Sequence, residues 1–329
     1  MASFSTFGNE LYTGERSYDI VGKRKIWYIV AAVLILIAII VPILRGGFVF
    51  GIEFRGGSQF QVSDTTNLKQ SLATQTVQSV VPNANPKITI IGDHSVRIQT
   101  DQLTNTQNVK TQEALAKAYN VPVKQVTSSF IGATWGQDIT RQAVTGLIVF
   151  VLLAGAVMAL YFRTWKMSLA AIIALLHDLV ITAGFYGILG FEVTPAAVIG
   201  FLTILGYSLY DTVVVFDKIR ENTIEDGGDT TRTFAESVNY AVNQTLVRSI
   251  NTSVVAILPV AGILFIGALL LGAGTLRDIS LALFIGILVG TYSTIFIAAP
   301  MYAHLRSSDE LVKKHDKRVI SSRQASIVK

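Results

Sequence analysis

The segment IWYIVAAVLILIAIIVPIL, residues 26–44, is the first of several long apolar blocks and decides the fold class. It contains no charged residue, and a helix needs about 20 mostly apolar residues to cross a hydrocarbon core of about 30 Å. Five similar segments follow it. The predicted membrane-spanning helices are residues 26–44, 143–162, 168–189, 196–217, 250–271 and 280–302. We therefore predict an α-helical polytopic membrane protein with six transmembrane helices.

The composition of the whole chain agrees with this class. Of its 329 residues, 51% are hydrophobic and 15% are charged, whereas a soluble domain averages about 25% charged residues. This composition excludes a soluble enzyme, a disordered chain and a disulfide-stapled secreted domain. Because the chain has no cysteine, a thiolate nucleophile and a cysteine-bound metal are excluded too. The motifs GxxxxGK[ST], HExxH and GxGxxG are also absent, so an ATPase, a zinc protease or a dinucleotide enzyme has no support.

The distribution of Lys and Arg predicts the orientation in the membrane. Basic residues gather in segment 1–25, after the second and fourth spans, and in the tail 305–329. The loop 190–195 has none, and the loop 272–279 has only Arg277. Short cytoplasmic loops carry this excess in membrane proteins, so both termini are predicted to be cytoplasmic. The first span is then an uncleaved anchor, because its apolar run is too long for a signal peptide and no cleavage pattern follows it.

The basic tail and the net charge of +5 have the same explanation. We interpret the tail as topogenic and solvated, with a ribosome- or lipid-contacting patch as the alternative. A nucleic-acid partner is not needed to account for the charge.

Residues 45–142 form a polar extracytoplasmic domain between the first two spans. Period-two alternation in GGSQFQVS (56–63) predicts a strand, and helical spacing in NLKQSLATQTVQSVV (67–81) predicts a helix. Two strands around Gly92-Asp93-His94, a helix in 106–119 and a strand in 123–131 follow. The order strand, helix, strand, strand, helix, strand is that of ferredoxin-like domains. Its scattered carboxylates and single histidine favour binding or mechanical work over catalysis.

Inside the six segments, away from their ends, lie three ionisable side chains: His177, Asp178 and Asp211. A charge at that depth costs at least about 2.5–3.5 kcal/mol, and such groups often mark ion or proton paths. Helical spacing places Asp211 on a stripe of small or polar residues that favours helix packing. Tyr207, one turn away, is a predicted hydrogen-bond donor to the carboxylate, and Arg248 at the entry of the fifth span is the candidate cation.

A change of surroundings would give Asp211 a function. A carboxyl group beside a cation stays ionised, whereas one in a dry site keeps its proton. Movement between these two states would load and release a proton. The alternatives are structural: Asp211 or Asp178 as a hydrogen-bonding partner between helices, and His177 as a satisfied interior histidine.

Three stretches carry a resemblance to a known family. GIEFRGGSQFQV, from Gly51, resembles the Gly-Gly signature of the SecD/SecF proteins of bacterial protein export. GYSLYDTVVVFDKIREN (206–222) and TLVRSINTS (245–253) resemble the fourth- and fifth-span signatures of the SecF branch of that family. Six spans with one large outside domain also look like half of a resistance-nodulation-division transporter bundle.

The resemblance implies a role in the bacterial cytoplasmic membrane. It implies a proton-driven auxiliary of the SecYEG channel that pairs with a SecD-like subunit and assists translocating unfolded polypeptide, without being an enzyme. The proton would be the coupling ion, and no further cofactor is implied.

The resemblance also implies residue roles. Asp211 matches the proton-coupling carboxylate, Arg248 the arginine that acts with it, and His177-Asp178 a pair in the third span. The matching extracytoplasmic residues are Gly51, Glu53, Phe54, Gly56 and Gly57. Glu53 replaces the usual Asp, and Tyr210 stands where relatives often carry a polar residue. The Gly pair has a physical reason of its own, a tight backbone at the entry to the first strand.

Two other functions compete with this one. Half of a proton-driven small-molecule or lipid exporter of the same superfamily is the first, but such exporters usually have a second large outside loop. A scaffold that only stabilises the channel is the second, and it would leave the intramembrane charges unexplained.

Overall fold

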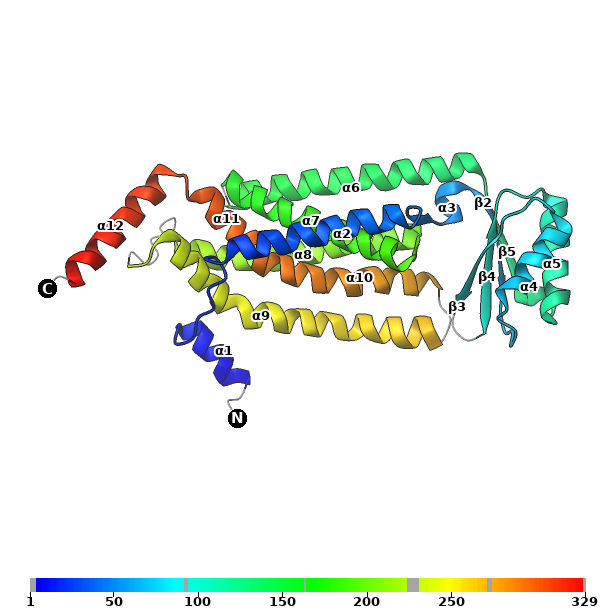
Figure 1. Cartoon of the computed structure of the whole chain (residues 1–329), viewed down its shortest axis with the longest axis horizontal. Coiled ribbons are helices and arrows are strands. Elements are labelled where there is room, and N and C mark those ends of the chain that lie inside the picture. The colour runs from blue at the N-terminus through cyan, green and yellow to red at the C-terminus, as the bar shows by residue number, and fades with distance from the viewer. Residues whose placement is uncertain (1–3, 92–93, 163, 224–230, 271–273, 328–329) are drawn as a thin grey trace.

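The computed structural model of the chain describes residues 4–91, 94–162, 164–223, 231–270 and 274–327. A long helical bundle carries an α/β domain at one end, and helices α1 (Phe4–Thr13) and α12 (Glu310–Ile327) lie at the other end (Figure 1). These are called the α/β end and the α12 end below. The predicted turn residues 92–93, and residue 271 of the predicted fifth span, lie outside the described residues.

Six helices in the described part of the chain are long and apolar enough to cross a membrane, as predicted. The first four are α2 (Arg24–Leu44), α6 (Ala133–Phe162), α7 (Trp165–Leu189) and α8 (Pro195–Asn222). The fifth is α9 (Phe234–Gly262), which continues as the π-helix Ile263–Leu270. The sixth is α10 (Gly274–Ser293), which continues through the π-helix Thr294–Ala298 into α11 (Ala299–Arg306). Several exceed their predicted limits at the α12 end. In particular, α9 begins at Phe234, sixteen residues before the predicted start of the fifth span, so Arg248 lies within the helix.

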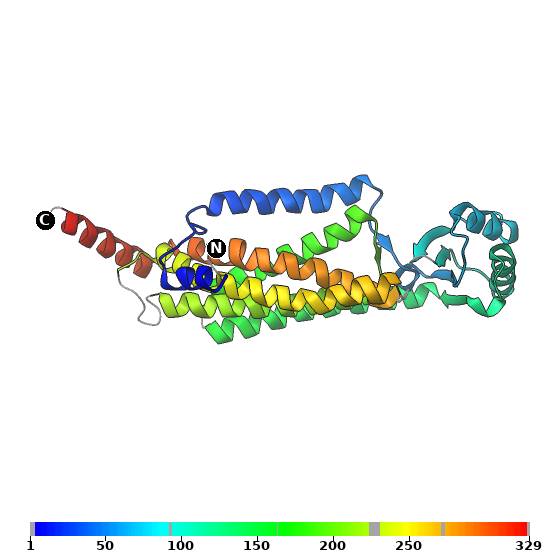
Figure 2. The same cartoon turned by 90° about the horizontal axis from the view of Figure 1, so that it is seen from below.

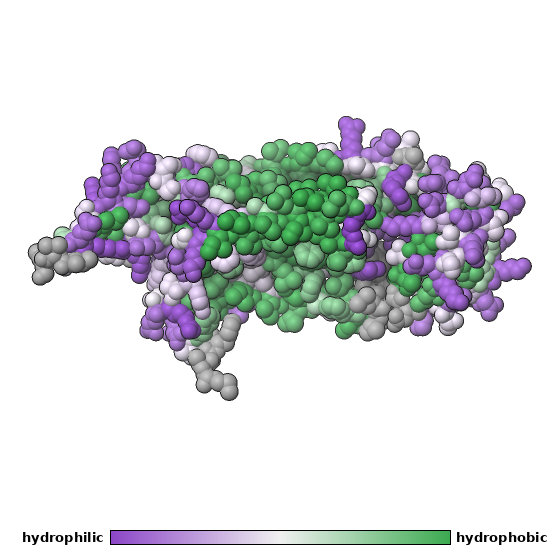
Figure 3. Space-filling model, in the orientation of Figure 1, coloured by the Kyte–Doolittle hydropathy of each residue, from purple (hydrophilic) through white to green (hydrophobic). Residues whose placement is uncertain are grey.

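On the face drawn in Figure 3, the surface of the bundle is a broad apolar belt between two polar ends. Exposed leucines and valines of α6 and α9 contribute to it, including Leu152, Val255 and Leu258. Lipid tails solvate such side chains well, and the polar ends fit the two aqueous boundaries. The belt therefore agrees with a multi-pass membrane protein.

Small residues bring the helices close together inside the bundle. A β-carbon on Gly184 of α7 would overlap Ala38 of α2, which lies along one flank of the bundle (Figure 2). A β-carbon on Gly200 of α8 would lie 2.7 Å from the β-carbon of Ala282 in α10. Such close contacts are the usual means of helix association in lipid, where no hydrophobic effect drives it.

The α/β domain has the predicted order of elements. They are β2 (Gly57–Val62), α4 (Gln70–Val80), β3 (Lys87–Ile91), β4 (Ser95–Thr100), α5 (Asn105–Tyr119) and β5 (Val126–Ile131). The sheet order is β3-β4-β2-β5, and every neighbouring pair is antiparallel. Phe60, Ile98 and Leu115 are fully buried between the sheet and the two helices. The other face of the sheet is turned toward the bundle (Figure 1).

The junction between the domain and the bundle is built from short elements. Strand β1 (Val49–Phe50) pairs in parallel with β6 (Glu192–Val193), which lies in the connection between α7 and α8. The short helix α3 (Ile52–Arg55) follows, and Gly56 and Gly57 then lead into β2 with φ of 76° and 139°. Positive φ favours glycine, so the tight backbone predicted for this pair is confirmed.

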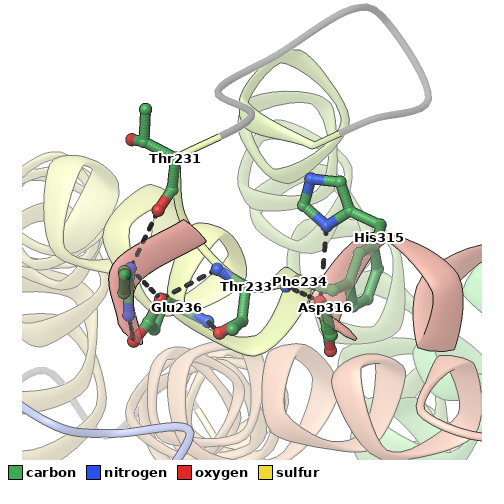
Figure 4. A network of polar contacts seen from close by, with 7 residues as sticks. Thr231, Thr233, Phe234, Glu236, His315 and Asp316 are labelled. Carbon is green, nitrogen blue, oxygen red and sulfur yellow. Dashed lines mark hydrogen bonds and ion pairs between the residues drawn. The ribbon is translucent and has the colours of Figure 1, made fainter. Parts of the chain in front are cut away.

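Helix α9 is held at the α12 end by side chains of α12 and by the backbone of residues 20–21. Its first turn has a capping box between Thr233 and Glu236. The carboxylate of Asp316 in α12 accepts a hydrogen bond from the Phe234 amide at 2.8 Å (Figure 4). Arg323 of α12 donates to Glu236. Asn239 of α9 accepts hydrogen bonds from the backbone amides of Ile20 and Val21.

Candidate functional site

A buried carboxylate lies where α8 meets α9. The side chain of Asp211 is almost fully buried, and its Oδ1 accepts a hydrogen bond from the Ser249 hydroxyl at 2.9 Å. Its Oδ2 has no hydrogen-bond partner among the described residues. An unpaired buried oxygen is costly, so Oδ2 is the atom of this carboxylate whose burial the described residues do not compensate.

A second buried carboxylate lies where α7 meets α8. Asp178 is 1% exposed, and its Oδ2 accepts a hydrogen bond from Ser208 of α8 at 2.6 Å. Its Oδ1 lies 3.3 Å from Nδ1 of His177. The other ring nitrogen of His177 is buried and has no hydrogen-bond partner in the described part of the chain. Ser208 and Asp211 are three residues apart, so one segment of α8 contacts both carboxylate sites.

Hydroxyl groups extend this polar interior toward α10. The hydroxyls of Thr212 and Thr294 lie 3.0 Å apart, and Ser253 bonds to Thr291 and to the backbone carbonyl of Ser249. A β-carbon on Gly290 would lie 3.2 Å from Ser208, so this glycine lets α10 approach the polar contacts. Four helices thus enclose the two carboxylates, an arrangement typical of intramembrane proton relays.

The two predicted neighbours of Asp211 interact with its carboxylate electrostatically. Within the described residues, however, Tyr207 makes no hydrogen bond to Asp211, and Arg248 makes no ion pair with it. Arg248 instead lines a pocket of about 390 Å³ at the α12 end, together with Asp217 and Lys218. The hydrogen bond predicted from Tyr207 to Asp211 is therefore not found among these residues, and the hydroxyl of Ser249 donates to the carboxylate instead.

Sequence reasoning did not single out Ser249, although a signal for it exists. Thr245, Ser249 and Ser253 recur every four residues, which places them on one face of α9. All three are buried. A stripe of hydroxyls in an apolar helix indicates a face that packs on protein, and Arg248 lies about 100° away from Ser249 around the same helix.

Replacing Ser249 with Ala is expected to remove the hydrogen bond to Asp211. The carbonyl stretch of the protonated Asp211 carboxyl should then move to higher frequency, because the bond to its oxygen is lost. Infrared difference spectroscopy of the purified protein measures this shift, assigned by its absence in Asp211→Asn. The variant Thr252→Ala, one turn from Arg248, is the control and should leave the band in place. An unchanged band in Ser249→Ala would contradict the contact.

The predicted extracytoplasmic motif lies at the junction of bundle and domain, whereas the two carboxylates lie within α7 and α8. Gly51 donates its backbone N–H to Val193, and Phe54 packs edge-on against Phe50. Glu53 is half-buried, and its Oε2 has no hydrogen-bond partner among the described residues. Burial raises the pKa of the Glu53 carboxyl above its usual value, and the nearby carboxylate of Glu192 acts in the same direction.

This raised pKa predicts a pH dependence of stability. As pH rises above about 4.5, the unfolded chain loses the Glu53 proton before the folded chain does. The free energy of unfolding of the α/β domain therefore decreases with pH until the folded-state pKa is passed. In Glu53→Gln this decrease should be absent. Hydrogen exchange of the β2 and β4 amides, corrected for intrinsic rates, measures the free energy of unfolding at each pH. Glu113→Gln, at an exposed position, is the control and should keep the wild-type slope of this free energy against pH. Equal slopes in all three proteins would contradict the assignment.

These observations define a class: a polytopic helical membrane protein with buried carboxylates between its central helices and one α/β domain between its first two spans. Comparison with protein families matches residues 110–308 to the C-terminal part of the protein export membrane proteins SecD/SecF. The chain therefore belongs to the SecD/SecF family, as its motifs suggested.

Individual relatives agree with this family assignment. The chain is 45% identical to protein translocase subunit SecF of Streptomyces coelicolor, over 100% of this chain and 87% of that protein. It is 31% identical to protein translocase subunit SecDF of Thermus thermophilus, over 83% of this chain and 37% of that protein.

Solved structures give the same result. The crystal structure of SecDF from Thermus thermophilus, described as a translocon-associated membrane protein, superposes with a TM-score of 0.76 at 28% identity. The match covers 89% of this chain and 39% of that one. A structure of SecDF in its super-membrane-facing form superposes with a TM-score of 0.60. This chain thus corresponds to about two fifths of SecDF.

Proposed function

We propose that this chain is a SecF-like accessory subunit of protein export that uses the proton gradient together with a SecD-like subunit. The observation that carries the proposal is the pair of buried carboxylates, Asp178 and Asp211, bridged by one segment of α8. The SecF and SecDF relatives support the export role, and they do not favour the alternative of a small-molecule or lipid exporter.

Proton coupling follows from the chemistry of the Asp211 site. In its present dry surroundings, with one hydroxyl as partner, the carboxyl group is suited to hold a proton. A shift of α8 against α9 that opens Oδ2 to water, or brings it toward Arg248, would favour release. Asp178 and His177 of α7 would take part in the same proton transfer. The proton is the only coupling ion that the proposal requires.

The proposed orientation places the α/β domain, as a ferredoxin-like domain, outside the cytoplasmic membrane. Both termini then lie in the cytoplasm with the basic residues of the α12 end, in keeping with the positive-inside bias. The domain is positioned to meet unfolded polypeptide that leaves the SecYEG channel.

A face of α8 and α9 is suited to the SecD-like partner. Tyr210 is 58% exposed and Asn251 is also exposed, although both lie in the membrane-spanning part of their helices. Polar groups facing lipid are costly and are usually covered by another helix. A second six-helix subunit would cover them.

Export into membrane vesicles tests the proposal. Vesicles that contain the SecYEG channel, its ATPase, a SecD-like subunit and this chain should export more preprotein when a proton gradient is present. A protonophore should remove that increment and leave the basal ATP-driven export. An increment that survives the protonophore would overturn proton coupling, and the absence of any increment would overturn the export role.

A further inference from the structure

Glu192 connects the membrane bundle to the α/β domain through its side chain. Its backbone belongs to the bundle side, because β6 pairs with β1 and the Gly51 amide donates to Val193 at 2.9 Å. Its carboxylate crosses to strand β4 of the domain. There it accepts hydrogen bonds from Arg97 at 3.2 Å and from Gln99 at 2.5 Å.

The Glu192 contact reaches a strand of the sheet that neither covalent connection joins to the bundle. The chain enters the domain at β2 and leaves it at β5, and these two strands are neighbours in the order β3-β4-β2-β5. Strand β4 lies on the other side of β2. The two covalent connections therefore fix one side of the sheet, and the Glu192 contact fixes the opposite side.

Glycines occupy both covalent connections. Gly56, with a φ of 76°, lies between α3 and β2, and Gly132 lies between β5 and α6. A β-carbon on Gly132 would meet no atom closer than 4.0 Å. Backbone rotation costs little at such positions, and hinges typically lie at the ends of elements. With the Glu192 contact open, the domain would be free to turn about these two connections.

Other carboxylates lie near enough to Arg97 to replace Glu192 as its partner. The side chains of Arg97 and Glu192 are only 14% and 12% exposed, so each needs an opposite charge when the other moves away. Arg97 also interacts electrostatically with Glu53 of α3 and Asp278 of α10. Asp278 accepts a hydrogen bond from Thr194, the N-cap of α8, at 2.8 Å. Arg97 thus has a second anionic partner close to the start of α8.

We propose that Glu192 is the contact through which movements of α7 and α8 reach the α/β domain. Glu192 lies in the connection between the helix that carries Asp178 and the helix that carries Asp211. A shift of either helix moves β6 and pulls on β4 through Arg97 and Gln99. The inference rests on the proposed function for the source of the movement, but the contact itself is tested separately.

Single-molecule fluorescence transfer provides this test, because the chain has no native cysteine. Dyes on Lys110→Cys in α5 and Leu189→Cys at the end of α7, both exposed positions, report the orientation of the domain. In vesicles with the SecD-like partner, the parent protein should give a narrow distribution that shifts when a proton gradient is applied. Glu192→Gln should broaden the distribution and abolish the shift.

The exchanged pair Arg97→Glu with Glu192→Arg is the matched control. It should restore a narrow, gradient-responsive distribution, which a merely destabilised domain would not do. A parent-like distribution and shift in Glu192→Gln would overturn the proposal. Failure of the exchanged pair to restore the shift, with the domain folded by circular dichroism, would also count against it.

Export into vesicles tests the consequence of this contact. Glu192→Gln removes the charge that holds Arg97 and should lose the gradient-dependent increment while it keeps the basal ATP-driven export. Glu113→Gln makes the same chemical change at an exposed position of α5 and should leave export unchanged. An undiminished increment in Glu192→Gln would overturn the coupling role. If Asp211→Asn retains full export while Glu192→Gln still broadens the distribution, the proposed function fails and the contact stands.

Discussion

Replacement of Asp211 with Asn is expected to reduce preprotein export to the level measured without a proton gradient. Asn keeps the size of the side chain and the acceptor for the Ser249 hydroxyl, but it cannot take up or release a proton. One charge crossing 100 mV supplies about 2.3 kcal/mol, which corresponds to a factor of about fifty in an equilibrium. The loss of gradient-dependent stimulation should approach that factor.

The same helix offers a matched control for Asp211→Asn. Asp217 is exposed at the α12 end of α8, so Asp217→Asn makes the same chemical change outside the buried site and should leave export unchanged. Vesicle export with and without a protonophore measures both variants, and insertion is checked by protease protection of the α/β domain. Full stimulation in Asp211→Asn would contradict the relay, as would equal losses in the two variants.

Replacement of Gly184 with Val is expected to separate α2 from α7. The new β-carbon would overlap Ala38, including its backbone Cα at 2.7 Å, and the rigid main chain of α2 cannot move aside locally. Overpacking of this kind costs about 1–3 kcal/mol or more. In detergent, the apparent melting temperature should fall by several degrees, since about 1 kcal/mol corresponds to about 2–4 °C in a chain of moderate size.

A glycine with open surroundings is the control for this prediction. Gly146 of α6 has no atom within 4 Å of an added β-carbon, so Gly146→Ala should leave the melting temperature unchanged or raise it slightly, because alanine favours helix. Fluorescence-detected size exclusion after heating measures both variants. Equal melting temperatures for Gly184→Val and the parent protein would show that α2 does not pack on α7 as described.

The membrane spans and the order of elements in the α/β domain could be predicted from the sequence, because both depend on local patterns. An apolar block of fixed length is required to cross the bilayer, and periods of 2 and 3.6 distinguish strands from helices. The partners of buried side chains depend instead on how helices are rotated against each other. Ser249 and Arg248 are adjacent in sequence, yet only Ser249 faces Asp211, and no local pattern around Asp211 contains that information.

Apolar blocks also do not reveal which helices face lipid. Residues of α6 are largely exposed, whereas α7 buries more than half of its most apolar window. Both helices are apolar enough to cross a membrane, because lipid tails and protein interior are similarly apolar surroundings. Glycines do not settle this either: Gly184 and Gly200 meet a neighbouring helix, whereas an added β-carbon on Gly146 would meet no atom within 4 Å. The side-chain contact from Glu192 to β4 has no sequence signature, because it joins segments about a hundred residues apart.

The capping of α9 by the last helix has a consequence for biogenesis. A ribosome delivers the chain from the N-terminus, so residues 20–21 are already available when Asn239 emerges and can be bound at once. Asp316 and Arg323, which complete the first turn of α9, are synthesised only after the sixth span. The amide of Phe234 therefore lacks its Asp316 acceptor until α12 has been synthesised. This part of the structure is completed only after the sixth span has been made.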